Sequence, residues 1–173
     1  MALKFDLLIF IVYPYSKGDD IMKNIKILSI LILIMFAATA CFAAETVRQA
    51  KVISTKGDTM VKKAGESSWV AAKVDMTVNQ GDMVKTGKSS NAILNLGGAG
   101  NVEVKENSQL SVAQLVQDSS TGDKKTLLDL AMGEVFIKAE KLRSKEEKFE
   151  VKTPTSIVGV RGTKFSVKVE AVK

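Results

Sequence analysis

The acidic side chains are the residues of this sequence with the clearest capacity for chemistry. Residues 44–173 contain no histidine, no cysteine and no tyrosine. A Ser-His-Asp triad, thiolate chemistry, disulfides and histidine metal ligands are therefore excluded from this part of the chain. What remains is chemistry by carboxylate pairs, lysine bases or carboxylate-bound hard cations. The carboxylate candidates are Asp82, Glu103, Asp129 and Glu134.

These four carboxylates lie at turns or at outward positions of expected strands. Acidic residues in such places ordinarily serve solubility and protect sheet edges from unwanted pairing. No EF-hand loop, Walker loop or dinucleotide fingerprint accompanies them. We therefore assign no catalytic residue, no metal site and no cofactor from the sequence. A carboxylate-dependent enzyme acting on envelope polysaccharide is kept as the alternative to a binding protein.

A second candidate is the stretch TPTSIVGVRGTKF, residues 153–165, which packs a proline, two glycines and an arginine among strand-forming residues. Pro154 holds the residue before it in extended backbone and has no N–H for a β-ladder. Gly159 and Gly162 permit backbone angles or close approaches that larger residues would block. The pattern predicts that the last strand bends around Val160.

Arg161 lies between those two glycines and carries five donors in a rigid fork. Such a fork can bind a carboxylate and unpaired backbone oxygens at a bend together. We expect Arg161 to be a structural clasp whose partner is one of the four carboxylates. A ligand contact is the alternative role.

The elements that must position these residues are short strands. Apolar and polar residues alternate at period two, and turn signals such as NQGD, TGKSS, KENS and MGE separate the alternating runs. The GGAG at 97–100 is followed by a second strand pattern, whereas a phosphate-binding loop would precede a helix, so it predicts a hairpin turn. The residues expected to face inward are Ala92, Leu94, Leu96, Val102, Val104, Leu110, Val112, Leu128, Leu130, Val135, Ile137, Phe149, Val151, Phe165, Val167 and Val169.

Strands of this length and spacing predict an all-β domain over residues 44–173. The nearly equal spacing from Val84 to Val112 favours a β-solenoid or β-roll, in which inward aliphatic side chains form a ladder. A two-sheet β-sandwich is the alternative, because periodicity does not fix how strands connect. Only residues 137–148 allow a short helix, and their mixed charges equally suit a solvated loop.

The amino end has the pattern of a secretory signal peptide at residues 22–43. Lys23 and Lys26 precede an apolar run from Ile27 to Ala38, and small residues come after it. As a helix this run would span about 18 Å, against about 30 Å for the hydrocarbon core of a membrane. We therefore expect cleavage between Ala43 and Ala44 and no transmembrane span after processing.

Two further interpretations concern the residues around this signal. ATAC, ending at Cys41, is a weak lipobox, so lipid anchoring through Cys41 is the alternative to cleavage at Ala43. Residues 1–21 fit neither scheme. We interpret them as a stretch upstream of the true start at Met22, with a genuine extended leader as the alternative.

Taken together, the segments SSWVAAKVDMTVNQGDMVKTGKSSNAILNLGGAGNVEVKENSQLSV, LDLAMGEVFIK and FEVKTPTSIVGVRGTKFSV resemble the FecR domain, the periplasmic part of ferric-citrate-type regulators of iron uptake. The resemblance covers roughly residues 52–169, and its most specific part is residues 153–165. The residues that carry it are Trp69, Gly81, Asp82, Thr86, Gly133, Thr153, Pro154, Gly159, Val160, Arg161, Gly162, Thr163 and Phe165.

The resemblance implies an all-β fold, an envelope location and binding rather than catalysis. Regulators of this type resemble a series of a cytoplasmic sigma-factor segment, a membrane span and this domain. Because the amino side here reads as a signal peptide, sigma-factor control is not carried over. The expected protein is a stand-alone, secreted, non-catalytic binding, sensing or scaffold module in the periplasm or at the cell surface.

The expected partner is an envelope protein or an anionic surface polymer, which the formal net charge of +6 allows. Nucleic acid is not expected, because the basic residues lack interleaved aromatics and the signal routes the chain away from it. Trp69 is expected to cap the first rung of the core. A platform for stacking sugars is its alternative role.

Overall fold

The computed structural model describes residues 45–170, and this part of the chain contains strands and no helix. The predicted all-β fold class is confirmed. Cys41, Ala43 and Ala44, on which the processing predictions depend, lie outside the described residues. The strands are β1 (Glu45–Val47), β2 (Ala50–Lys56), β3 (Thr59–Lys62), β4 (Val70–Ala71), β5 (Thr77–Val78), β6 (Met83–Thr86), β7 (Asn91–Asn95), β8 (Gly100–Val104), β9 (Gln109–Asp118), β10 (Lys124–Ala139), β11 (Lys148–Lys152), β12 (Ile157–Val160) and β13 (Lys164–Val169).

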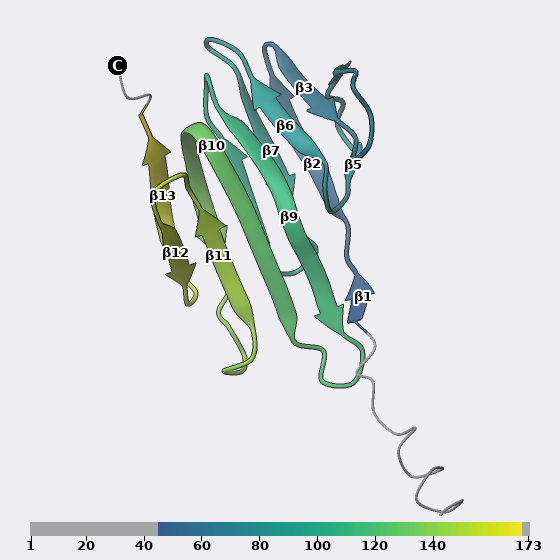
Figure 1. Ribbon diagram of the computed structural model, residues 1–173, viewed down its shortest axis with the longest axis vertical. Helices are drawn as coiled ribbons and strands as arrows, with labels where there is room; N and C mark the ends of the chain where they lie inside the picture. The colour runs from purple at the N-terminus through teal and green to yellow at the C-terminus, as the bar shows by residue number, and fades with distance from the viewer. Residues whose placement is uncertain (1–44, 171–173) are drawn as a thin grey trace, which may run out of the picture. The chain divides into compact units, whose positions relative to one another are not determined.

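All thirteen strands join one curled sheet (Figure 1). Its main order is β4-β3-β6-β9-β10-β8-β7-β2-β5, with β1 added to β9, β11 and β13 to β10, and β12 to β11. The paired strands run antiparallel except β10 and β11, which run parallel. Strands distant in sequence thus become neighbours, such as β1 with β9, β2 with β7 and β10 with β13.

The long strand β10 divides the sheet into two halves. Its first part pairs with β9 and β11, and its second part, from Gly133 onward, pairs with β8 and β13. We call the two resulting halves of the sheet the β9 half and the β8 half. The β9 half contains the first part of β10 with β1, β3, β4, β6, β9, β11 and β12. The β8 half contains the second part of β10 with β2, β5, β7, β8 and β13. Gly133 has a φ of +89°, and a Cβ there would lie 2.2 Å from Ser108 Oγ, so only glycine fits where the strand passes from one half to the other.

A single hydrophobic core lies between the inner faces of the two halves. Of the residues expected to face inward, Phe165 and Val169 are half-buried against this core and the others are buried in it or beside it. The alternation at period two is confirmed strand by strand, because successive side chains of a strand point to opposite faces. The ladder of aliphatic side chains is compatible with a solenoid-like stack and with a sandwich alike.

Two connections between strands have forms that the sequence allowed. Residues 97–100 form the turn between β7 and β8, so the predicted hairpin is confirmed. The segment between β10 and β11 is a loop, which was one of the two forms expected for that charged stretch. No helix within residues 45–170 has the length and apolar character needed to cross a membrane.

Candidate functional site

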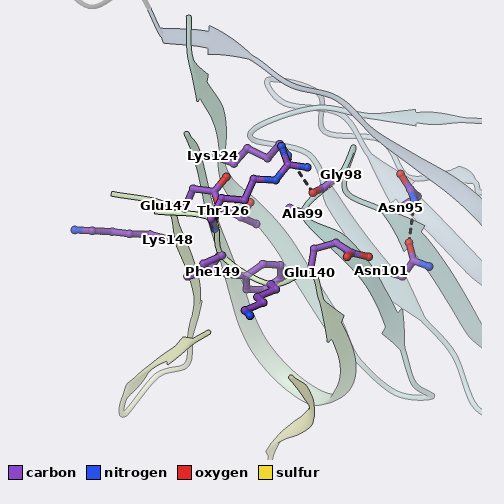
Figure 2. Close-up of a pocket in the computed structure, with 14 residues that line it drawn as sticks. Asn95, Gly98, Ala99, Asn101, Lys124, Thr126, Glu140, Glu147, Lys148 and Phe149 are labelled. Atoms are coloured by element: carbon purple, nitrogen blue, oxygen red, sulfur yellow. Dashed lines mark hydrogen bonds between the residues drawn. The ribbon is translucent and has the colours of Figure 1, made fainter. Parts of the chain in front are cut away.

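A cleft of about 380 Å³ lies at one end of the sheet (Figure 2). Three segments form it: the turn between β7 and β8, the start of β10, and the loop that leads from β10 into β11. The residues lining it are Asn95, Gly98, Ala99, Gly100, Asn101, Lys124, Thr126, Glu140, Lys141, Leu142, Arg143, Glu147, Lys148 and Phe149. We call it the basic cleft.

Cations outnumber anions among the residues lining the basic cleft. The cations are Lys124, Lys141, Arg143 and Lys148, and the anions are Glu140 and Glu147. None of the four cations is in an ion pair with a described acidic residue. The walls of the cleft therefore offer positive charge to a ligand.

Glu147 stabilises the fold of the loop and does not present its carboxylate to the open space of the cleft. Its side chain is buried, and Oε2 accepts a hydrogen bond of 2.6 Å from the backbone N–H of Arg143. The bond closes a tight turn that holds residues 143–147 in place. Ser144 Oγ adds to this turn by donating to Asp123 Oδ1 at 2.7 Å. These hydrogen bonds therefore hold in place the loop backbone that carries the basic side chains.

The opposite wall of the cleft is the turn between β7 and β8, whose conformation requires glycine. Gly100 has a φ of +124°, and a Cβ there would lie 2.2 Å from the carbonyl oxygen of Lys138. Asn95 Oδ1 accepts from the backbone N–H of Gly97 at 3.0 Å, and Lys124 Nζ donates to the carbonyl of Gly98 at 3.2 Å. Figure 2 shows Lys124 reaching over this turn. The turn thus fixes one of the four cations at the mouth of the cleft.

Arg48 bonds Thr126, which lines the cleft, and holds the two halves of the sheet together. It is 9% exposed. Its guanidinium donates to Leu96 O at 2.7 Å from the β8 half, and to Val116 O at 3.2 Å and Thr126 Oγ1 at 2.7 Å from the β9 half. Burial lowers the pKa of Arg48, and the nearby negative charge of Glu147 offsets part of that effect.

Sequence reasoning missed Arg48. A signal for it was present, because Arg48, in the link between β1 and β2, continues the alternation of buried positions at Ala50 and Val52. An arginine on an inward face must satisfy its five donors inside the fold. Here backbone carbonyls and one hydroxyl do so, and no carboxylate of residues 45–170 bonds Arg48 directly.

Arg161 is not the clasp that the sequence predicted. Its side chain is exposed, and within residues 45–170 it makes no hydrogen bond or ion pair. It lines a second hollow of about 320 Å³, together with Lys145. That hollow shares Leu142, Glu147, Lys148 and Phe149 with the basic cleft. The clasp prediction is therefore wrong for Arg161, and Arg161 instead extends the cationic surface beside the cleft.

The glycines beside Arg161 differ in what they do. Gly162 has a φ of +75°, and a Cβ there would lie 2.7 Å from Lys141 Cα, so glycine lets this turn pack against the loop that forms the cleft. A Cβ on Gly159 would meet nothing within 4 Å. Val160 is buried, and the carbonyl of Thr163 accepts from Ala139 N at 3.1 Å. The turn therefore lies at Gly162, with Val160 as the last residue of β12.

Thr153 and Pro154 form the turn before β12. Thr153 Oγ1 accepts from Ser156 N at 3.0 Å, and the backbone N–H of Thr153 donates to Ser156 O at 2.8 Å. The exposed Pro154 lies within this turn, where it interrupts no ladder. These two residues reverse the chain between β11 and β12.

The four candidate carboxylates are not brought together. Glu103 bonds Lys105 Nζ at 2.7 Å, Asp129 lies 3.9 Å from Lys152 Nζ, and Glu134 accepts from Ser166 Oγ at 2.6 Å. Asp82 bonds a different lysine and the backbone of a turn. Within residues 45–170 no three carboxylates group closely enough to hold a metal ion.

Asp82 is a buried structural carboxylate. It accepts hydrogen bonds of 2.8 Å each from Lys63 Nζ, Ala64 N and Asn79 N. Burial on its own raises the pKa of Asp82, but these bonds together outweigh burial and leave the pKa below its ordinary value. Gly81, beside it, adopts a φ of +89°. This turn organises the approach to β6.

The remaining motif residues are structural or lie away from the cleft. Thr86 Oγ1 accepts from Ser108 N at 3.1 Å, which ties two turns together. Trp69 is half-buried and is not part of the core or packed against it, so the predicted core cap is wrong. Its ring lies on the outer face of the β9 half, with Lys85 Nζ 4.7 Å and Lys62 Nζ 5.5 Å from the ring centroid.

Comparison with known proteins gives one family match. The model of the family described as FecR protein matches residues 82–173. The match covers all of the residues that line the basic cleft and all of residues 153–165. No curated protein and no solved structure matches the chain.

Proposed function

The chain belongs to the FecR family of periplasmic regulatory domains, and on that premise we propose that it is a non-catalytic binding and sensing module of the cell envelope whose basic cleft takes an anionic polymer. The family supplies the class of function. The cations around the cleft, which form no ion pair within residues 45–170, indicate an anionic ligand.

The observation that carries the proposal is the arrangement of charge at the cleft. Four cations line it, and Glu147 is buried and engaged with the loop backbone, which leaves Glu140 as the exposed acid. The adjoining hollow adds two cations, Lys145 and Arg161, and one further acid, Glu150. A chain of carboxylate or phosphate groups can contact both hollows in succession, whereas a small ion fills only one.

A polymer held in this way is bound by several exposed charge pairs, each of them weak. Exposed pairs contribute about 0.2–1 kcal/mol apiece and are screened over a Debye length of about 8 Å at physiological ionic strength. Affinity should therefore depend on the number of anionic groups in the polymer and fall as salt rises.

Titration calorimetry with polygalacturonate and long-chain polyphosphate, and with neutral dextran as the control polymer, tests the proposal. The protein should bind both anionic polymers and not dextran. The double variant Arg143→Glu/Lys148→Glu should lose at least about tenfold in affinity, since two attractions become repulsions. The matched control Lys73→Glu/Lys88→Glu makes the same change in net charge at exposed residues outside the cleft. Equal losses of affinity in the two double variants would show that net charge alone explains the binding. That result would refute the basic cleft as the binding site.

The proposal includes export and processing at the amino end. We expect the protein isolated from its host to begin at Ala44, and intact mass spectrometry measures this directly. A terminus at Cys41 that carries acyl mass would replace the secreted form with a lipid-anchored one.

The carboxylate-enzyme alternative receives no support from the geometry. Glu103, Asp129 and Glu134 each have a separate basic or hydroxyl partner, and Asp82 is buried in a turn. Purified protein should therefore release no reducing ends from the acidic polysaccharide that it binds. Release of reducing ends above that of a heat-denatured sample would overturn the non-catalytic assignment.

A further inference from the structure

The last two strands of the described chain, β12 and β13, each have one edge that pairs with no other described strand. Within residues 45–170, β12 pairs with β11 alone and β13 pairs with β10 alone. Residues 161–163 join them, and Figure 1 shows both at one margin of the sheet. Unpaired edges expose rows of backbone donors and acceptors that can pair with another chain.

A hollow of about 820 Å³ lies beside the second half of β13. Val167, on β13, is buried in the core, and Val158 and Val169 are half-buried against it. Met132, at the bend of β10, is 46% exposed in the same hollow. An apolar side chain entering here would contact core residues that solvent now reaches.

The outward face of β13 has a different character. Lys164 lies directly opposite Lys138 of β10, and both side chains are exposed. Neither lysine has an ion-pair partner in the described chain, whereas Lys168 bonds Glu170 at 2.8 Å. Like charges directly opposite each other in a sheet are destabilising. A carboxylate added next to Lys164 would relieve this repulsion.

We propose that the free edge of β13 receives an extended segment of a partner protein by β-strand addition. Side chains of a strand point alternately to the two faces. The added segment therefore alternates apolar residues, which enter the hollow beside Val167, with acidic residues, which face Lys164. The six residues of β13 span about 20 Å, enough for several backbone hydrogen bonds that give affinity while the alternation gives specificity.

A second copy of this chain is a poorer occupant of the same edge. In the register centred on Ser166, antiparallel pairing of β13 with β13 of another copy sets Lys164 opposite Lys168 of that copy, on one face. The pairing would add a further repulsion to the existing one between Lys164 and Lys138. The site also differs from the basic cleft, because the two share no lining residue.

An eight-residue peptide alternating glutamate and valine is the probe for this edge. Hydrogen exchange measured by mass spectrometry on the full protein should show that the peptide slows exchange in residues 164–170. A peptide of the same composition with four valines followed by four glutamates should not. Lys164→Glu should weaken binding about tenfold, since it turns an attraction into a repulsion, and should improve binding of a valine–lysine peptide.

Two control variants distinguish binding at this edge from an effect of net charge and from binding at the basic cleft. Lys73→Glu makes the charge change of Lys164→Glu at a distant exposed residue, and it should leave peptide binding unchanged. Arg143→Glu/Lys148→Glu should likewise leave the protection of residues 164–170 in place. Absence of protection there, equal binding of the block peptide, or a concentration-dependent dimer that protects 164–170 without peptide would each overturn the proposal.

Discussion

Replacement of Arg48 by alanine should be among the most destabilising single changes in this domain. The substitution leaves the carbonyls of Leu96 and Val116 and the hydroxyl of Thr126 without their buried donor, and it removes the positive charge near the buried Glu147. A buried acceptor left without its donor costs about 1–3 kcal/mol, so the three together cost about 3–5 kcal/mol or more. For a domain of this size, that loss lowers Tm by about 10–20 °C.

Thermal and urea unfolding followed by circular dichroism measure this loss. Arg48→Lys should recover only part of the stability, because an ammonium cannot reproduce a fork of five donors. Arg161→Ala is the matched control, since it removes the same side chain from an exposed position, and its Tm should stay within about 2 °C of the parent. If Arg48→Ala melts within a few degrees of the parent, or if Arg161→Ala loses as much, the assignment of the clasp to Arg48 is wrong.

Glycine geometry, acid titration and cysteine content each give a further expected outcome. Gly133→Ala should lower Tm by several degrees, because its Cβ would meet Ser108 Oγ at 2.2 Å and φ is +89°, whereas Gly159→Ala, with open space around its Cβ, should leave Tm nearly unchanged. The folded-state pKa of Asp82 is depressed, so its contribution to the free energy of unfolding is present above about pH 4 and is lost as pH falls through the folded pKa. Urea titrations should therefore show a smaller acid-dependent loss in Asp82→Asn than in the parent, and an unchanged acid dependence would contradict this. Reductant should not change Tm in protein that begins at Ala44, since Cys41 is the only cysteine.

The strands could be predicted well from the sequence because burial on one face imposes a period of two. Leu94 and Leu96, or Val102 and Val104, are recognisable as inward residues without any knowledge of their neighbours. The order of the strands was not predictable in this way. It depends on Gly133, where β10 passes from one half of the sheet to the other, and a single glycine in a strand pattern does not say which strands meet on each side.

The candidate site was less predictable than the fold. Three segments distant in sequence form the basic cleft, and among them only the turn at 97–100 has a distinctive sequence pattern. Arg161 lies in the most distinctive stretch of the chain, which favoured it as the clasp, but a bend with glycines on both sides leaves it in solvent. Arg48 has the inward register that a clasp requires, although no motif surrounds it. Position relative to the core, more than the distinctiveness of a motif, decided which arginine became structural.

The most direct test of the central claim is to find where an anionic polymer touches the protein. Hydrogen exchange should be measured with and without polygalacturonate at low salt, and repeated at high salt. We predict slower exchange in residues 97–100 and 140–149, around the basic cleft, with the effect lost at high salt. Protection confined to residues 164–170, or no protection anywhere while the polymer is bound, would contradict this claim.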